Sequence, residues 1–311
     1  MHKINMITFE TAQISLQLAG QNARPTTTQI TNILPDQNPS PFLFSFPHSG
    51  HNYTQNFVAT SRLDFINLRS SEDAYVDQLF TQISHQGGNK LSALFPRAFV
   101  DVNRLANDLD PALFIEPLND DANIYAPLIK AGLGVIPRVV AHQQNIYHSK
   151  ISLTQGQSRL DKHYHPYHSL LETLTTSAQI HYGFSLLIDC HSMPSRFSKN
   201  QPAPDFIIGD LHGQSCNRHV SETIYKHFQS CGFSVRLNQP YAGGAITRKY
   251  QTVQLGLHSV QLEINRGLYM DEKRIQKTEN FTQIENILTG LSQKIIDIKP
   301  EYLIPYQNAA E

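Results

Sequence analysis

Two histidines stand directly after short apolar segments, where a buried strand would deliver each of them to the edge of a sheet. His48 follows Phe42–Phe46, a segment bounded by prolines, and His191 follows Phe184–Asp189. The carboxyl ends of strands in α/β folds are where reactive groups gather. Imidazoles are common zinc ligands, and a catalytic zinc keeps one position open for water. The two histidines therefore predict half of a zinc site.

An acid is expected to complete this set of ligands. Glu72, Asp73 and Asp77 lie at the start of the helix predicted after the first of these strands. The alternative is that these acids only favour a helix N-terminus, where negative charge is stabilising. Asp189 stands two residues before His191, so both side chains point to the same side of a strand. That spacing predicts a carboxylate that orients the imidazole of His191.

A guanidinium follows another apolar segment. Asn103 and Arg104 come after Ala98–Val102, which we predict to be a strand. The planar fork of an arginine matches a carboxylate with two hydrogen bonds, so this pair predicts a site for a substrate carboxylate. A salt bridge from Arg104 to a loop is the alternative.

A carboxylate also lies inside an apolar segment. Glu263 belongs to Ser259–Ile264, and a buried carboxylate needs a partner or a raised pKa. Both properties suit a general base that takes a proton from water at the metal. A buried ion pair with Arg266 is the alternative. Gly243 and Gly244 predict a loop whose backbone approaches a ligand closely.

These residues must be positioned by alternating strands and helices. The apolar segments that predict strands are Phe42–Phe46, Ala98–Val102, Val135–Ala141, Phe184–Asp189, Phe206–Ile208 and Ser259–Ile264. Helical periodicity or capping predicts one helix that begins at Ser71 and three more that cover residues 158–181, 215–230 and 279–298. Pro166 should break or kink the first of these three. The pattern predicts an α/β fold, with a mixed, mostly parallel central sheet and helices on both faces. We expect a lead-in over residues 1–40 and a single catalytic domain over residues 41–311.

Two other sets of reactive side chains are assigned no chemistry. His163, His165 and His168 flank Pro166 in a charged helical segment, and we interpret them as a solvated helix face rather than a metal site. Cys190 alternates with His191 along its strand, so we expect it to lie in the core and not to act as a nucleophile.

Composition excludes several classes of protein. The chain has 311 residues, with 25 Lys and Arg against 26 Asp and Glu, for a net charge of −1. That balance argues against a nucleic-acid partner and against a polybasic membrane anchor. The apolar runs are far shorter than the roughly 20 residues of a membrane span. The first 20 residues lack the apolar core of a signal peptide, and three cysteines suit a reducing compartment, so we expect a cytoplasmic protein.

Six short motifs occur in an order that resembles the N-formylglutamate amidohydrolase (N-formylglutamate deformylase) family. They are PHSG at 47–50, VDVNR at 100–104, DCHSMPS at 189–195, DFIIGDLHG at 205–213, NQPYAGGAIT at 238–247 and QLEINRGLYMDE at 261–272. The family is similar in fold to zinc carboxypeptidases and aspartoacylase-type deacylases. The resemblance runs from about Pro41 to Asp271. It implies zinc-dependent hydrolysis of N-formyl-L-glutamate to formate and L-glutamate, a step of histidine degradation.

The resemblance also implies roles for individual residues. His48, Asp73 and His191 would hold one zinc, or another divalent metal, and Glu263 would be the general base for water activated by it. Arg104 would act on the substrate together with Asn103, Gly243, Gly244 and Arg266. The related deacylases have a Glu three residues after the first His, where this chain has His51. The third metal ligand is therefore Asp73, Glu72 or His51.

Two alternatives to this function stay open. One is a hydrolase of another N-acyl amino acid with the same site. The other is a non-catalytic protein that binds acidic amino-acid derivatives, which the presence of Glu263 with both histidines argues against. The sequence sets neither the acyl group nor the oligomeric state.

Overall fold

The structure is a computed structural model that describes residues 30–33, 40–198 and 200–305. The lead-in predicted over residues 1–40 lies almost entirely outside the described residues. Of that segment, Ile30–Ile33 forms a strand. The division into a lead-in and one catalytic domain stays a prediction.

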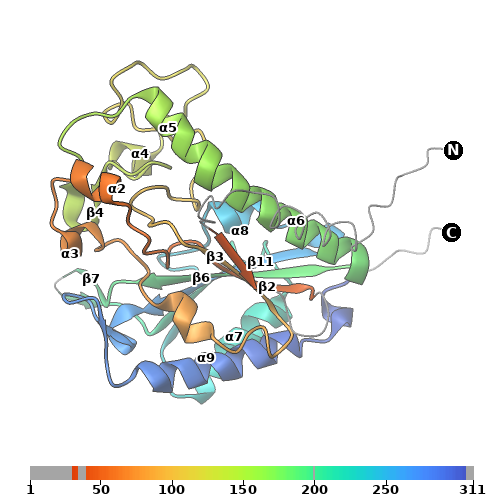
Figure 1. Ribbon diagram of the computed structural model, residues 1–311. Helices are drawn as coiled ribbons and strands as arrows, with labels where there is room; N and C mark the ends of the chain where they lie inside the picture. The colour runs from red at the N-terminus through yellow and green to blue at the C-terminus, as the bar shows by residue number, and fades with distance from the viewer. Residues whose placement is uncertain (1–29, 34–39, 199, 306–311) are drawn as a thin grey trace, which may run out of the picture.

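A seven-stranded mixed sheet forms the centre of the molecule (Figure 1). In spatial order its strands are β1 (Ile30–Ile33), β3 (Asn89–Ala93), β2 (Phe42–Phe46), β6 (Ser185–Met193), β11 (Leu257–Asn265), β9 (Phe206–Gly209) and β10 (Val235–Leu237). Four neighbouring pairs are parallel, and the pairs β1–β3 and β9–β11 are antiparallel. The predicted mixed, mostly parallel α/β sheet is confirmed.

Three small two-stranded sheets lie outside the central one. They pair β4 (Val139–Val140) with β5 (Gln144–Asn145), β7 (Arg196–Ser198) with β8 (Gln201–Pro202), and β12 (Met270–Asp271) with β13 (Gln276–Lys277). All six of these strands are only two or three residues long.

Helices cover both faces of the central sheet. In Figure 1, α6 lies above the sheet, and α7 and α9 lie below it. The α-helices are α2 (Gln55–Thr60), α3 (Phe65–Leu68), α4 (Pro127–Lys130), α5 (Leu153–Arg159), α6 (His165–Tyr182), α7 (Arg218–Ser230), α8 (Ala245–Lys249) and α9 (Phe281–Ile296). Short 3-10 helices cover Val76–Phe80, Ala141–Gln143, Val253–Leu255, Arg266–Leu268 and Pro300–Tyr302.

Alternation along the strands gives the two faces different characters. On β2, Phe44 and Phe46 pack into the apolar cluster that includes residues of α7 and α9. Cys190 of β6 lies in the same cluster, as expected. Ser45, Asp189 and His191 alternate with these residues and therefore point to the face covered by α6. The two candidates that lie on β6, Asp189 and His191, thus share one face of the sheet.

Two predicted strands are wrong. Residues 98–102 form turns rather than a strand, and Val135–Ala141 contributes only the two residues of β4, since Pro137 interrupts it. The side chains of Val100 and Val102 are nevertheless buried, so their apolar character reflects packing alone. Two strands of the central sheet beyond residue 40, β3 and β10, are missing from the prediction. β3 carries Asn89, Lys90 and Ser92 and so lacks an apolar pattern.

The helices predicted at 215–230 and 279–298 are confirmed as α7 and α9. The helix predicted from Ser71 is wrong. Turns replace it up to Tyr75, whose φ of 65° is left-handed, and a 3-10 helix covers only Val76–Phe80. The expected irregularity near Pro166 is a π-helical turn, Leu160–Tyr164, which joins α5 to α6.

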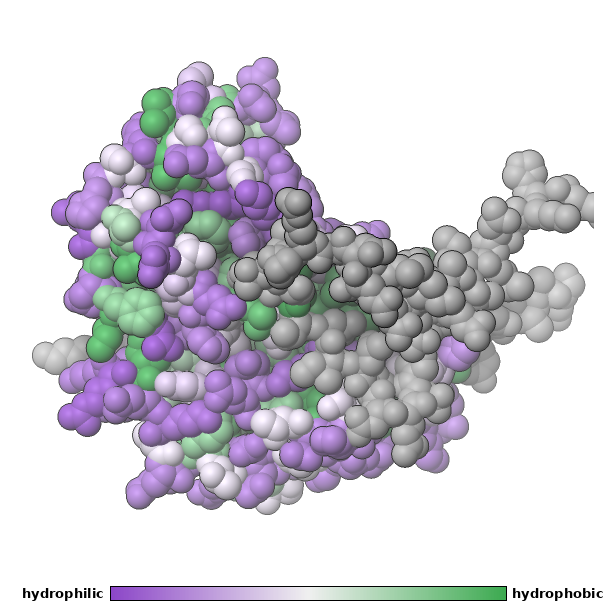
Figure 2. All heavy atoms as spheres, in the orientation of Figure 1, coloured by the Kyte–Doolittle hydropathy of each residue, from purple (hydrophilic) through white to green (hydrophobic). Residues whose placement is uncertain are grey.

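The surface is mostly polar. Figure 2 shows hydrophilic side chains over much of the face seen there, with apolar side chains scattered among them. Exposed apolar residues include Phe65, Ile66, Leu105, Ile115 and Tyr125. In the part of the chain that the structure describes, no helix has the length and apolar character needed to cross a bilayer.

Candidate active site

Two neighbouring strands bring His48 and His191 together. β2 and β6 pair in parallel, with Ser45 beside Asp189. His48 lies two residues beyond the end of β2, and His191 lies two residues before the end of β6. Both side chains are almost fully buried. The Nδ1 atoms of the two rings lie 3.1 Å apart.

Asp73 completes a group of three. Its Oδ2 lies 3.2 Å from Nδ1 of His191 and 3.4 Å from Nδ1 of His48. The backbone N–H of Asp73 donates to the carbonyl of His48, which ties the turn before the 3-10 helix to the end of β2. All three residues predicted as metal ligands are therefore brought together, and no second group of this kind occurs among residues 30–33, 40–198 and 200–305.

Each histidine has a carboxylate on its far nitrogen. Nε2 of His48 lies 2.7 Å from Oδ1 of Asp101, and Nε2 of His191 lies 2.8 Å from Oδ2 of Asp189. An ionised carboxylate only accepts hydrogen bonds, so both Nε2 atoms carry the proton. Burial alone would raise the pKa of Asp101, but the charges of Arg97 and Arg104 hold it well below the usual value. The Nδ1 atoms of the two rings then face each other, and in a neutral ring each carries a lone pair. Burial would lower the pKa of His191, but the charges of Asp189 and Glu263 and the contact with Asp73 hold it well above the ordinary value.

Asp73 is fixed by a separate set of contacts. Its Oδ1 accepts from Nη2 of Arg266 at 2.9 Å and from the hydroxyl of Ser192 at 3.1 Å. Burial would raise the pKa of Asp73, but its contacts with His191 and His48 and the charge of Arg266 keep it well below its ordinary value. Asp73 is therefore ionised, with Oδ2 free to face the histidines.

The other two candidates for the third ligand lie elsewhere. Glu72 makes a two-bond ion pair with Arg69 and accepts from the hydroxyl of Tyr53. His51 is exposed, and its Nδ1 lies 3.4 Å from the carbonyl of Ser49. Neither belongs to the group formed by His48, Asp73 and His191.

The three facing atoms fit a small divalent cation. Two imidazole lone pairs and a carboxylate oxygen repel one another unless a proton or a metal cation lies between them. A tetrahedral zinc with bonds of about 2.0–2.1 Å holds its ligand atoms about 3.3 Å apart, and the observed separations are 3.1, 3.2 and 3.4 Å. The carboxylates on both Nε2 atoms are the partners that metal-binding histidines ordinarily have.

Glu263 lies beside this group. It is directly opposite His191 in the register of β6 and β11. Its Oε1 accepts from the side-chain amide of Gln261 at 2.7 Å. Burial raises the pKa of Glu263 to about 7, and the negative charge of Asp73 acts in the same direction. The alternative ion pair with Arg266 is not formed, because that guanidinium binds Asp73, Ser192 and the carbonyl of Ser70.

Asn103 holds the glycine loop against the site. Its side-chain oxygen accepts from the backbone N–H of Ile246 at 2.9 Å, and its Nδ2 lies 3.3 Å from Nε2 of His191. A Cβ on Gly244 would lie 2.3 Å from Nδ2 of Asn103, so only glycine fits there. Gly243 has a φ of +129°. The two glycines are therefore explained by the packing of the loop, whether or not a ligand approaches them.

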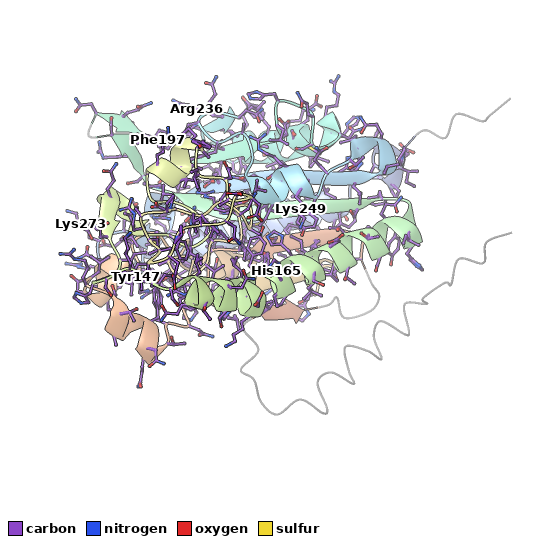
Figure 3. All side chains as sticks on the ribbon, turned by 90° about the horizontal axis from the view of Figure 1, so that it is seen from above. Tyr147, His165, Phe197, Arg236, Lys249 and Lys273 are labelled. Atoms are coloured by element: carbon purple, nitrogen blue, oxygen red, sulfur yellow. The ribbon has the colours of Figure 1, made fainter. Side chains whose placement is uncertain are left out.

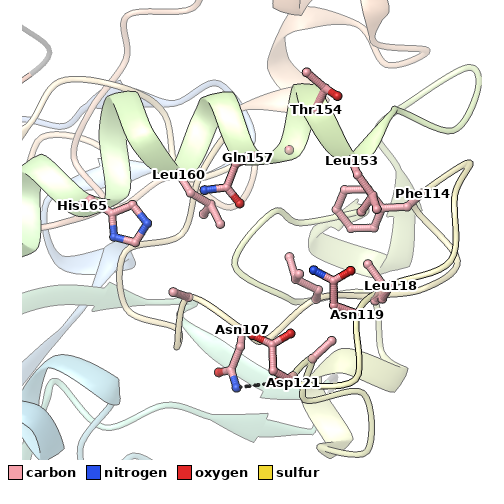
Figure 4. Close-up of a pocket in the computed structure, with 14 residues that line it drawn as sticks. Asn107, Phe114, Leu118, Asn119, Asp121, Leu153, Thr154, Gln157, Leu160 and His165 are labelled. Carbon is pink, nitrogen blue, oxygen red and sulfur yellow. Dashed lines mark hydrogen bonds between the residues drawn. The ribbon is translucent and has the colours of Figure 1, made fainter.

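These residues line a pocket of about 730 Å³. Its walls include His48, Asp73, Asn103, Arg104, His191, Gly243, Gly244, Glu263 and Arg266, which are all the residues predicted for the site. Figure 4 shows a different pocket, of about 420 Å³, between residues 106–122 and the helical segment that runs from α5 into α6. None of the predicted residues lines this second pocket.

Three functional residues escaped prediction. Asp101 orients His48, Ser192 supports Asp73, and Arg97 lines the pocket with its Nε bonded to Asp101. The sequence carried no signal for Asp101, because residues 98–102 are not a strand and its partner His48 lies 53 residues away. Arg97 carried no signal either.

The interpretation of His163, His165 and His168 as a solvated helix face is wrong for His168. Its side chain is 4% exposed and contacts the hydroxyl of Tyr250 and the carbonyl of Val102. Cys190, in contrast, is fully buried as expected, and burial raises the pKa of its thiol well above the ordinary value. A thiol in that state is not a nucleophile.

Known proteins share both the sequence and the fold. The chain is 27% identical over 253 residues to N-formylglutamate deformylase of Pseudomonas putida, covering 79% of this chain and 86% of that protein. The Pseudomonas aeruginosa enzyme of the same name is 26% identical, with 75% of this chain and 83% of that protein covered. The crystal structure of N-formylglutamate amidohydrolase from Ralstonia eutropha JMP134 superimposes with a TM-score of 0.82 at 29% identity, covering 89% of this chain and 98% of that one.

A protein from Agrobacterium tumefaciens known as gene product Atu2144 shares the fold, with a TM-score of 0.62 at 14% identity, covering 86% of this chain and 95% of that one. The family model described as N-formylglutamate amidohydrolase matches residues 40–270, which contain the whole site described above. This chain belongs to the N-formylglutamate amidohydrolase family.

Proposed function

We propose that this protein hydrolyses N-formyl-L-glutamate to formate and L-glutamate, with a zinc ion held by His48, Asp73 and His191. The observation that carries the proposal is the group of three facing ligand atoms beside Glu263 in one pocket. The activity named for the relatives supports the choice of substrate. A role of this reaction in histidine degradation is part of the proposal, and a cytoplasmic location stays a prediction.

The bound metal would polarise the formyl carbonyl and lower the pKa of a coordinated water, which is the chemistry that zinc supplies in hydrolases. Asp101 and Asp189 hold the Nε2 atoms of His48 and His191, so that the Nδ1 atoms of the two rings are aimed at one point. Arg266 and Ser192 donate to Oδ1 of Asp73 and so hold its Oδ2 toward the same point. The chain therefore supplies a preformed site, which reduces the cost of organising the reaction.

Glu263 is the general base in this proposal. It accepts a proton from the attacking water as the oxygen–carbon bond to the formyl group forms. It then gives that proton to the amine nitrogen as the carbon–nitrogen bond breaks. A pKa of about 7 suits both steps, because a group that titrates near neutral pH accepts and returns a proton with little penalty.

Cationic side chains hold the substrate. Arg104 binds a substrate carboxylate, assisted by Asn103, and its own position is fixed by hydrogen bonds to the carbonyls of Leu133 and Asn103. Arg97 donates to Asp101 through Nε, and its terminal nitrogens make no hydrogen bond to the residues that the structure describes. Its terminal nitrogens then stabilise the negative charge that develops on the formyl oxygen.

A metal analysis paired with an assay of formate release tests the proposal. We expect about one zinc per chain and zinc-dependent release of formate from N-formyl-L-glutamate. N-acetyl-L-glutamate is the matched control for the acyl group. Faster turnover of the acetyl compound would assign the protein to another N-acyl amino acid. Binding of N-formylglutamate without release of formate from any N-acyl amino acid would identify a non-catalytic protein.

A further inference from the structure

Four arginines line the active-site pocket, and they differ in how many of their guanidinium nitrogens are occupied by the protein itself. They are Arg97, Arg104, Arg248 and Arg266. All three guanidinium nitrogens of Arg266 donate to Asp73, Ser192 or Ser70. In Arg104, Nε and one terminal nitrogen donate to carbonyls, and the other lies 3.7 Å from Asp101.

Arg248 differs from the other three. Its side chain is exposed at the pocket wall and makes no hydrogen bond or ion pair within residues 30–33, 40–198 and 200–305. Arg97 is anchored by Asp101, which holds His48, so it belongs to the metal end of the pocket. Arg248 therefore offers an unpaired positive charge at the wall of the pocket.

The backbone that carries Arg248 is fixed to the catalytic group. Arg248 lies on α8, and its backbone N–H donates to Gly244. The same loop is held by a bond from the N–H of Gly244 to Gln261 and by a bond from the N–H of Ile246 to Asn103. Gln261 also donates to Glu263. The guanidinium thus projects from an element whose position is tied to the base and to the carboxylate-binding loop.

We propose that Arg248 binds the side-chain carboxylate of the substrate and thereby makes the enzyme selective for acidic N-formyl amino acids. This inference rests on the proposed function. An N-formylglutamate molecule carries two carboxylates. One is attached to Cα, next to the scissile amide, and the other lies two methylenes further away. Arg104 suits the first, and an unpaired arginine at the exposed wall suits the second. An unpaired cation also attracts an anionic substrate into the pocket.

Pairing N-formyl-L-glutamate with N-formyl-L-glutamine provides the test. The two molecules have nearly the same shape and differ in the charge of the side chain. We expect Arg248→Gln to lower kcat/KM for N-formylglutamate by about 10- to 100-fold, the range for hydrogen bonds to charged groups. The same variant should change kcat/KM for N-formylglutamine by less than about threefold.

Two comparison variants separate this effect from others. Arg104→Lys should lower kcat/KM for both substrates by the same factor, because both carry the carboxylate on Cα. Lys249→Gln removes a neighbouring charge that does not line the pocket; its side chain lies over the ring of Tyr250 (Lys249 is labelled in Figure 3). It should leave the preference for N-formylglutamate over N-formylglutamine unchanged.

Calorimetric binding of the product L-glutamate gives a readout independent of turnover. The Arg248→Gln variant should bind L-glutamate about 10-fold or more weakly and L-glutamine as the wild type does. An equal loss on both substrates, or an unchanged preference, would overturn the role of Arg248 while leaving the deformylase assignment intact. If the wild-type protein hydrolyses neither compound, the proposed function itself fails.

Discussion

Two kinds of buried histidine occur in this molecule, and they differ in what their second nitrogen faces. In His168, Nε2 donates to the carbonyl of Val102 at 2.9 Å, and Nδ1 accepts from the hydroxyl of Tyr250 at 2.8 Å. In His48 and His191, Nε2 is similarly satisfied, but the two Nδ1 atoms face each other and Oδ2 of Asp73. The protein therefore occupies both ring nitrogens of His168, whereas the Nδ1 atoms of His48 and His191 are directed at one shared point.

Burial alone therefore does not identify a metal ligand. All three histidines are almost completely buried, at 4% exposure or less. What distinguishes the pair at the strand ends is a carboxylate behind each ring and a third anion, Asp73, in front. Substitutions around His48 and His191, and at His168, test whether these two kinds of buried histidine are distinct.

Asp73→Asn should have the largest effect on the chemistry. Asparagine can keep the contacts to Ser192 and Arg266 but removes the negative charge between the histidines. Removing an outer partner of a ligand usually costs about 10–100-fold in metal affinity, and removal of a ligand charge should exceed that range. Zinc titration against a chelator and formate release measure the loss. Normal zinc affinity would show that Asp73 is not a ligand.

Glu263→Gln should lower kcat by about 10²–10⁴, the usual range for general acid–base catalysis. The amide keeps the size of the side chain but cannot take a proton. Zinc content and thermal unfolding should match those of the wild type. Loss of zinc in this variant would make Glu263 a ligand, whereas nearly normal kcat would mean that the base lies elsewhere.

Asp189→Asn should have an intermediate effect. The carboxylate fixes the proton of His191 on Nε2 and is itself held by Ser45 at 3.3 Å. An amide can accept at the same place but carries no charge, so we expect zinc affinity to fall by about 10–100-fold. The kcat of the zinc-saturated variant should change much less than in Glu263→Gln. An unchanged affinity would contradict the orienting role.

His168→Leu should leave zinc content and kcat within about twofold of the wild type. It should lower the free energy of unfolding near pH 7.5, because the carbonyl of Val102 and the hydroxyl of Tyr250 lose a buried partner, at about 1–3 kcal/mol. Denaturant unfolding measures this change. Loss of zinc from the variant would mean that the two classes of histidine are not distinct.

The stability contributed by His168 should also depend on pH. Burial lowers the pKa of His168 to about 4 in the folded protein, against about 6.5 in an unfolded chain. The unfolded state then binds the proton first, so this stability is complete above pH 6.5 and is lost as the pH falls toward 4. The difference in unfolding free energy between wild type and His168→Leu should therefore shrink between pH 7.5 and 5. A constant difference would contradict this titration.

The sequence was sufficient for the parts of the site that short spacing controls. The alternation of Asp189, Cys190 and His191 along one strand assigns each side chain to a face, because successive residues of a strand point to opposite sides. Apolar segments of five or six residues located β2 and β6, and helical periodicity located α7 and α9. The six ordered motifs were enough to indicate the family, which the comparisons confirm.

Only the tertiary structure decided which acid faces the histidines and which histidine belongs to the core. Glu72 and Asp73 are adjacent in the chain, but Arg69 binds the first and Arg266, from almost 200 residues away, binds the second. Tyr250 and Val102 likewise satisfy His168 from distant segments. Such partners come together only when the chain folds, because hydrogen bonds between segments remote in sequence leave no periodic or local signal.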